Sequence, residues 1–165
     1  MSAVAVLERA RELWPVFEGR PGFRVGGWSE VERMVTAEVG MGASGAGNHV
    51  WVPPRRLYVV TADTRAPSAL TTLFLGWLAG ADLTFKLPSG GAGEFEATVR
   101  EVLDRLGAAW GRKVRLEREW EQEAWEAAET VVVFGRDETV AHFRGLTKRW
   151  QRFLGYGHKI SAAWL

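Results

Sequence analysis

The chain has 165 residues, of which 47% are hydrophobic and 25% charged, which suits one domain with its own core. Its net charge of +1 gives no global attraction to nucleic acid or to an anionic membrane. The absence of cysteine excludes disulfides, thiolate metal sites and a cysteine nucleophile within this chain.

The longest apolar stretch, residues 66–81, is interrupted by Gly76 and Gly80. It is shorter than the ~20 residues that a transmembrane helix requires. The N-terminal sequence MSAVAVLERAREL is amphipathic and carries charges from Glu8 onward, which does not fit a signal peptide. We therefore expect a cytoplasmic protein without a membrane span.

The first third of the chain is predicted to be helical and then irregular. Apolar residues recur at helical spacing over residues 3–17, and a second helix is predicted over residues 28–39. Residues 40–56 are rich in glycine and then bounded by prolines, so they are predicted to form a loop. Residues 1–56 are accordingly assigned to an N-terminal helical segment with a Gly/Pro-rich loop.

Strand and helix patterns alternate from residue 57 to residue 165. Short apolar runs predict strands, and longer runs of helical spacing separate them. The predicted strands are 57–61, 82–86, 112–117, 130–135 and 152–156. The predicted helices are 66–80, 93–107, 119–129 and 137–146.

This alternation predicts an α/β fold for residues 57–165. Short connections are typical of parallel strands that are joined by right-handed helical crossovers. The strands at 57–61 and 130–134 are nearly continuous apolar runs, as expected where helices cover both faces of a sheet. We therefore predict an open, mostly parallel sheet of about five strands with helices on both faces.

The predicted helix at 119–129 is strongly acidic. We interpret its carboxylates as a solvated face, and a metal or partner site is the less favoured alternative. The three histidines of the chain are too widely separated to match zinc-ligand spacing. The acidic residues concerned are Glu119, Glu121, Glu123, Glu126 and Glu129.

Ligands of open α/β sheets bind beyond the carboxyl ends of the strands. Three loops follow such ends, at residues 61–69, 86–91 and 134–139. Lys86 opens the second loop with a cation that can hold an anion. Gly135, in the third loop, precedes a helix whose N-terminal amides can receive a phosphate.

Each of these features also has a purely structural interpretation. Lys86 can be a surface cation at a strand end, and Gly135 can serve only a tight turn. Asp137 or Thr139 can serve only to start the helix. The chain contains neither a GxGxxG nor a Walker A sequence. The expected location of the three loops at one edge of the sheet makes a nucleotide site as good an interpretation as the structural ones.

Three blocks in this part of the chain resemble a known family. GWLAGADLTFKLPS (76–89), VVVFGRDETVAHFR (131–144) and FLGYGHKISAAWL (153–165) are similar, in this order, to blocks of the bacterial LuxC-type acyl-CoA reductases. That family belongs to the aldehyde dehydrogenase superfamily of oxidoreductases. The resemblance implies a Rossmann-like cofactor domain and runs from about residue 57 to the end of the chain.

The resemblance also implies roles for individual residues. Lys86 and Ser89 match the element that holds the adenosine ribose, where the lysine can also meet a 2′-phosphate. Gly135 matches the turn that faces the phosphates of the cofactor, and Asp137 and Thr139 match the start of the helix behind it. No carboxylate follows Lys86 closely in sequence, so NADPH is favoured over NADH as the cofactor.

Two features depart from the pattern of the family. Arg136 stands where a small residue is expected, and its guanidinium can either pair with a phosphate or fill the phosphate's space. The catalytic cysteine of the family lies in a separate domain beyond the third block, whereas this chain has no cysteine. Acyl transfer from coenzyme A needs that thiolate. We therefore expect no catalytic residue here and no activity of the isolated chain.

Two main functional hypotheses remain open. In the first, the chain is the NADPH-binding portion of an acyl-CoA or aldehyde reductase, with a catalytic-domain subunit or a second copy of itself as partner. In the second, it is a non-enzymatic binding or assembly module that retains the fold. Nine tryptophans and the apolar sequence ISAAWL favour a surface that docks on a protein. A small-molecule enzyme that uses Lys86 or His158 as acid or base is a weaker third possibility.

Overall fold

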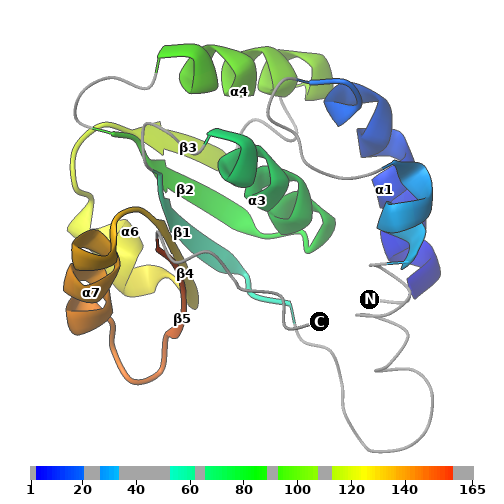
Figure 1. The fold of residues 1–165 in the computed structure, drawn as a ribbon. Coiled ribbons are helices and arrows are strands. Elements are labelled where there is room, and N and C mark those ends of the chain that lie inside the picture. Colours follow the sequence, from blue (N-terminus) through cyan, green and yellow to red (C-terminus); the bar gives the residue numbers. More distant parts are fainter. Residues whose placement is uncertain are drawn as a thin grey trace, which may run out of the picture.

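The structure is a computed structural model that describes residues 3–20, 27–33, 53–61, 66–88, 93–107 and 113–157. Five parallel strands form one open sheet with helices on both faces (Figure 1), which confirms the predicted α/β fold. The strands are β1 (Arg56–Val60), β2 (Asp82–Lys86), β3 (Val114–Glu117), β4 (Thr130–Phe134) and β5 (Arg152–Tyr156). The principal helices are α1 (Ala3–Phe17), α3 (Ala66–Leu78), α4 (Gly93–Leu106), α6 (Gln122–Ala127) and α7 (Asp137–Leu146).

The strand order is β3-β2-β1-β4-β5, and all four neighbouring pairs are parallel. The chain winds outward from β1 to β3 and then returns to the other side of β1 to form β4 and β5. Val60, at the end of β1, is paired with Lys86 of β2 and with Val133 of β4. The direction of winding therefore reverses between β1 and β4, which is the position where open α/β sheets bind ligands.

One face of the sheet carries the main hydrophobic core, which α1 shares with α3 and α4 (Figure 1). Phe17 of α1 makes edge contacts with Phe74 and Trp77 of α3, at ring-centroid distances of 5.2 and 5.9 Å. All three side chains are fully buried. The N-terminal helical segment and the α/β domain, which the sequence separates at residue 56, therefore share one core.

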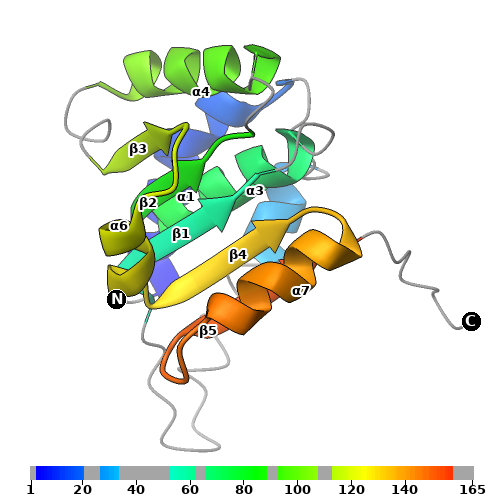
Figure 2. The ribbon, with the colours of Figure 1, turned by 90° about the vertical axis from the view of Figure 1, so that its left-hand side faces the viewer.

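The opposite face carries a second, smaller cluster beneath α6 and α7, which lie in front of the sheet in Figure 2. Trp125 of α6 is buried and makes an edge contact with Tyr58 of β1, at 5.5 Å between ring centroids. Trp120 stacks on Phe143 of α7 at 5.5 Å. Burial is the main cause that raises the pKa of Tyr58 above its ordinary value.

Helix α6 is shorter than the predicted helix at 119–129. It begins at Gln122, after Trp120 has turned inward onto Tyr58 and Phe143. It ends at Ala127, because the buried Ala128 is already extended (φ −70°, ψ 132°) and leads directly into β4. None of the helices in the described ranges is both long enough and apolar enough to cross a membrane.

Candidate functional site at the carboxyl edge of the sheet

Lys86 is the last residue of β2 and lies beside the switch between β1 and β4. Its backbone is paired with Val60 of β1 and with Glu117 of β3. Neighbouring strands are about 4.8 Å apart, so the ends of β2 and β4 are separated by about 10 Å. A ligand that spans this distance along the edge can contact Lys86 and the β4–α7 turn together.

The backbone of Lys86 is fixed by Thr61, the residue that follows β1. Both the backbone N–H and the hydroxyl of Thr61 donate to the Lys86 carbonyl oxygen, each at 3.0 Å. The half-buried ammonium of Lys86 donates to the carbonyl oxygen of Leu87 at 2.5 Å. Within the described part of the chain, no carboxylate forms an ion pair with it. The ammonium thus keeps donors that an anion can use.

Gly135 forms the turn between β4 and α7, as the sequence predicts. Its backbone N–H donates to the carbonyl oxygen of Tyr156 at 3.2 Å. A Cβ atom at this position would lie 3.0 Å from both Cβ and Cγ2 of Thr139. A larger residue would force Thr139 to shift by a few tenths of an ångström, which supports the structural interpretation and leaves a role in cofactor binding as a prediction.

The N-terminus of α7 carries both signs of charge. Arg136 is the N-cap residue, is exposed, and makes no capping hydrogen bond with its side chain. Asp137 and Glu138 occupy the first turn, where carboxylates stabilise the helix by interacting with its positive end. Asp137 lies against Gly157, where a Cβ atom would collide with Oδ1 of the aspartate. These two carboxylates disfavour a phosphate directly on the helix N-terminus and leave Arg136 as the nearby cation.

The structure brings most of the predicted site residues to the same edge of the sheet. Lys86 is at the end of β2, and the remainder lie in the β4–α7 turn and the first turn of α7. These are Gly135, Arg136, Asp137 and Thr139. Ser89, His158 and the terminal sequence ISAAWL lie outside the described residues, as do residues 62–65 of the first predicted loop.

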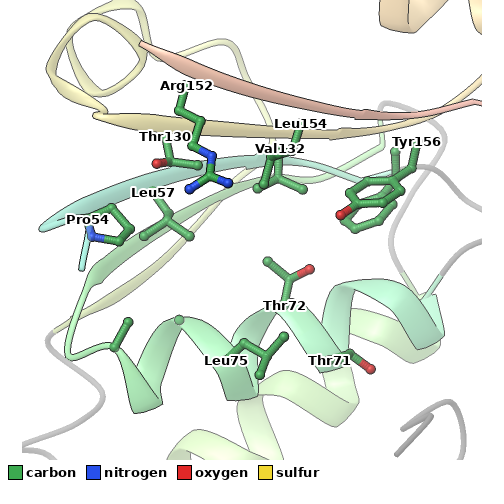
Figure 3. Close-up of a pocket in the computed structure, with 13 residues that line it drawn as sticks. Pro54, Leu57, Thr71, Thr72, Leu75, Thr130, Val132, Arg152, Leu154 and Tyr156 are labelled. Carbon is green, nitrogen blue, oxygen red and sulfur yellow. The ribbon is translucent and has the colours of Figure 1, made fainter. Parts of the chain in front are cut away.

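Sequence reasoning missed an apolar groove of about 550 Å³ on the sheet face between α3 and β5 (Figure 3). Arg152 reaches over the sheet at one end of this groove, and Tyr156 stacks on Phe134 at the other, with 5.0 Å between ring centroids. The alternation of Arg152, Leu154 and Tyr156 along β5 is the signal that could have indicated it. The other lining residues include Leu57, Leu75, Thr130 and Val132.

The acidic residues around α6 are largely balanced by neighbouring cations and amides. Glu121 pairs with Arg115 at 3.1 Å, beside a polar depression of about 390 Å³. A hydrogen bond from Gln122, helped by Lys148 at 3.1 Å, lowers the pKa of Glu126 below its ordinary value. Across the described ranges there is no cluster of three or more histidine, aspartate or glutamate side chains arranged to hold a metal ion.

The strand order and the parallel direction of the five strands define a Rossmann-like α/β fold. No family model matches this sequence, and no curated protein is significantly similar to it. The resemblance to LuxC-type acyl-CoA reductases therefore remains a hypothesis that is based on the three sequence blocks.

Proposed function

We propose that the chain binds a dinucleotide, NADPH in preference to NADH, at the carboxyl edge of its sheet. In this proposal it is the cofactor-binding portion of an acyl-CoA reductase or a related aldehyde dehydrogenase-like oxidoreductase. The resemblance of the three sequence blocks supports the family assignment. The location of Lys86 beside the winding switch is the observation that carries the proposal.

Lys86 is the residue we assign to the adenosine end of the cofactor. Its ammonium interacts with the ribose and, in NADPH, forms a charge-assisted hydrogen bond with the 2′-phosphate. The pyrophosphate then lies toward the β4–α7 turn, about 10 Å away. There Arg136 supplies positive charge that offsets the nearby carboxylates of Asp137 and Glu138.

The chain supplies binding and orientation in this proposal, and the acyl-transfer chemistry requires a partner. When bound, the nicotinamide cofactor supplies the hydride for a reduction. The thiolate that accepts an acyl group must come from another domain or subunit, because this sequence has no cysteine.

Calorimetric titration of the purified chain tests the proposal. We expect NADPH to bind more tightly than NADH, and adenosine 2′,5′-bisphosphate to bind more tightly than AMP. The two smaller nucleotides isolate the contribution of the 2′-phosphate from that of the nicotinamide half. The proposal is wrong if none of the four nucleotides binds, and the assignment to NADPH is wrong if NADH binds at least as well.

A non-enzymatic assembly module is the second candidate function. It is favoured by two exposed side chains that line the apolar groove, Leu75 of α3 and Tyr156 of β5. The two functions are compatible, because the candidate cofactor site occupies the carboxyl ends of the central strands rather than the β5 edge.

A further inference from the structure

The outer edge of β5 carries backbone groups that no described residue pairs with in the sheet. Within the described part of the chain, β5 pairs only with β4. The N–H of Arg152 donates to Glu129 at 2.9 Å, and the carbonyl oxygen of Tyr156 accepts from Gly135 at 3.2 Å. Backbone groups alternate in direction along a strand, so those of Phe153 and Gly155 point away from the sheet.

The two edge strands of the sheet differ in how well they are protected from pairing with a strand of another molecule. The other edge strand, β3, has only four residues and carries Arg115 and Glu117, charges that discourage strand pairing. By contrast, β5 has five residues, and its only charge is at its first position, Arg152. A longer edge strand with aromatic and aliphatic side chains is a template for pairing with another strand.

We propose that β5 pairs antiparallel with β5 of a second copy of this chain, about a twofold axis at Leu154. The two five-stranded sheets then form one continuous sheet. A twofold axis makes the contact self-complementary, so the outward backbone groups of each β5 strand bond with those of the other. The pairing therefore ends with two copies. This inference does not depend on the proposed cofactor binding.

The hydrogen-bond directions of β5 fit this register. With Leu154 on the axis, Phe153 lies opposite Gly155 of the partner subunit, and Gly155 lies opposite the partner's Phe153. These are the residues whose N–H and C=O groups point outward. In each opposed pair, the N–H of either residue donates to the C=O of the other. Leu154 then meets the partner's Leu154 as a non-hydrogen-bonded pair, in which side chains are closest.

The side chains are also complementary in this register. Arg152 lies opposite Tyr156 of the partner subunit, which allows a cation–π contact and keeps the two arginines apart. Tyr156 is 49% exposed in the single chain, so pairing removes aromatic surface from water. On the other face, Phe153 lies opposite the partner's Gly155, and its ring stays packed over Gly155 of its own strand and under Arg144.

The apolar groove gives a second reason for a partner of this kind. Leu154 and Tyr156 of β5 line the groove on the side opposite α3 (Figure 3). In the paired sheet, the same residues of the partner subunit extend this apolar surface and flank it. The contact therefore covers the outer part of the groove as well as the strand edge.

Helix α7 leaves room for the partner on the opposite face. Thr139 packs against Gly135 of the β4–α7 turn, and Phe143 packs against Trp120 beside α6. Residues two positions apart on a helix point to nearly opposite sides. Ala141 and Gly145 therefore face away from β4, and both are exposed.

The small side chains on this flank of α7 matter for the packing of the two copies. No heavy atom lies within 4 Å of a Cβ atom built on Gly145. Arg144 lies on the β5 side of α7, with its guanidinium 5.0 Å from the centroid of the Phe153 ring, so in the paired sheet Ala141 and Gly145 add little bulk beside it. Small residues allow two helices to approach closely, so the two α7 helices fit side by side.

A single engineered cysteine tests the register directly, because the chain has no other cysteine. In Leu154→Cys, the two Cα atoms across the twofold axis would be about 4.5 Å apart, a distance that a disulfide can bridge. The matched control is Leu116→Cys, because Leu116 is also a half-buried leucine in an edge strand that packs against the main core. We expect mild oxidation to convert Leu154→Cys into a covalent dimer and to leave Leu116→Cys monomeric on a non-reducing gel.

Sedimentation of the parent chain and of charge variants gives an independent test. We expect the parent to sediment with the mass of a dimer at micromolar concentration. Leu154→Lys and Leu154→Glu alone should lose the dimer, because like charges meet at the axis, and an equal mixture of the two should recover it. Circular dichroism of each variant verifies that the fold is retained.

The proposal is wrong if the parent sediments as a monomer at every concentration tested. It is also wrong if the parent is a dimer but Leu154→Cys cross-links no faster than Leu116→Cys, since another surface then forms the contact.

Discussion

Thr61 donates two hydrogen bonds to a single acceptor, the backbone carbonyl oxygen of Lys86. Its N–H and its hydroxyl both lie 3.0 Å from that oxygen. Because the acceptor belongs to the backbone, the carboxyl ends of β1 and β2 stay joined whichever side chain occupies position 86. The ammonium of Lys86 can therefore be removed without loss of this connection.

Lys86→Ala should weaken the binding of NADPH with little effect on folding. A hydrogen bond to a charged group contributes about 1.5–3 kcal/mol, so the dissociation constant should rise by roughly tenfold to a hundredfold. The binding of NADH should weaken less, because that nucleotide has no 2′-phosphate. Titration of both nucleotides into the parent and the variant measures the difference.

Lys113→Ala is the matched control for this experiment. Lys113 precedes β3 at the opposite end of the strands, where its Nζ donates to Gly80 at 3.1 Å and lies 3.8 Å from Asp82. Its removal should leave the affinity for NADPH unchanged. If the parent and Lys86→Ala bind NADPH with equal affinity, Lys86 does not contact the cofactor and its assignment is wrong.

Glu96→Gln should destabilise the protein at neutral pH and have little effect in acid. Glu96 accepts hydrogen bonds from Arg100 and from Arg118, with the nearest oxygen–nitrogen distances both 2.7 Å. The bond from Arg100 is the main cause that lowers the pKa of Glu96, and Arg118 adds to it. The carboxylate therefore contributes stability above its ordinary pKa, and that contribution is lost as the pH falls through the lowered value.

Urea unfolding of the parent and of Glu96→Gln across a pH series measures this effect. The difference in the free energy of unfolding should shrink as the pH falls below about 4. Glu12→Gln is the control, because the exposed Glu12 has no ion pair within the described ranges. A constant difference between parent and Glu96→Gln at all pH values would contradict the linkage.

Gly155→Ala should destabilise the domain. A Cβ atom on Gly155 would lie 2.5 Å from Cγ1 of Val140 and 2.8 Å from Cε1 of Phe153, so both side chains must move to make room. Overpacking of this kind costs about 1–3 kcal/mol. Gly145→Ala is the control, because its surroundings within a single chain are open and alanine favours a helix over glycine by about 0.5–1 kcal/mol. Thermal unfolding at one protein concentration should show opposite shifts for the two variants.

The 165-residue chain alone should not reduce an acyl-CoA. The acyl group needs a thiolate acceptor, and this sequence has none. NADPH consumption in the presence of an acyl-CoA should equal that of a blank without protein. A rate above the blank that increases with protein concentration would show that another residue accepts the acyl group.

The sequence predicted most of the secondary structure because its patterns are local. The strands at 82–86 and 152–156 and the helix at 137–146 have the predicted bounds, since apolar runs and flanking turns mark them clearly. The acidic helix was predicted too long, because its charge pattern did not reveal that Trp120 and Ala128 are held by contacts with distant residues.

The strand order and the packing of α1 could not be predicted from local patterns. The pairing of Val60 with Val133, and the contact of Phe17 with Trp77, join residues that are far apart in sequence. The candidate site was predicted only in part, because its packing also depends on contacts that local sequence patterns do not show. The sequence indicated Lys86 and Gly135 as residues at strand ends, but not that Gly135 packs closely against Thr139.

The strand order also has a consequence for how the chain folds. The β1–β2, β2–β3 and β4–β5 pairs each join strands that are consecutive in sequence, whereas β1–β4 must close across both intervening strands. Because the entropic cost of closing a loop grows with its length, the docking of β4 on β1 is expected to come late. Every residue of β4 is buried in the native sheet, so an intermediate that lacks this contact exposes an apolar run of three valines and a phenylalanine. Aggregation during refolding should therefore begin at β4, before the two halves of the sheet have joined.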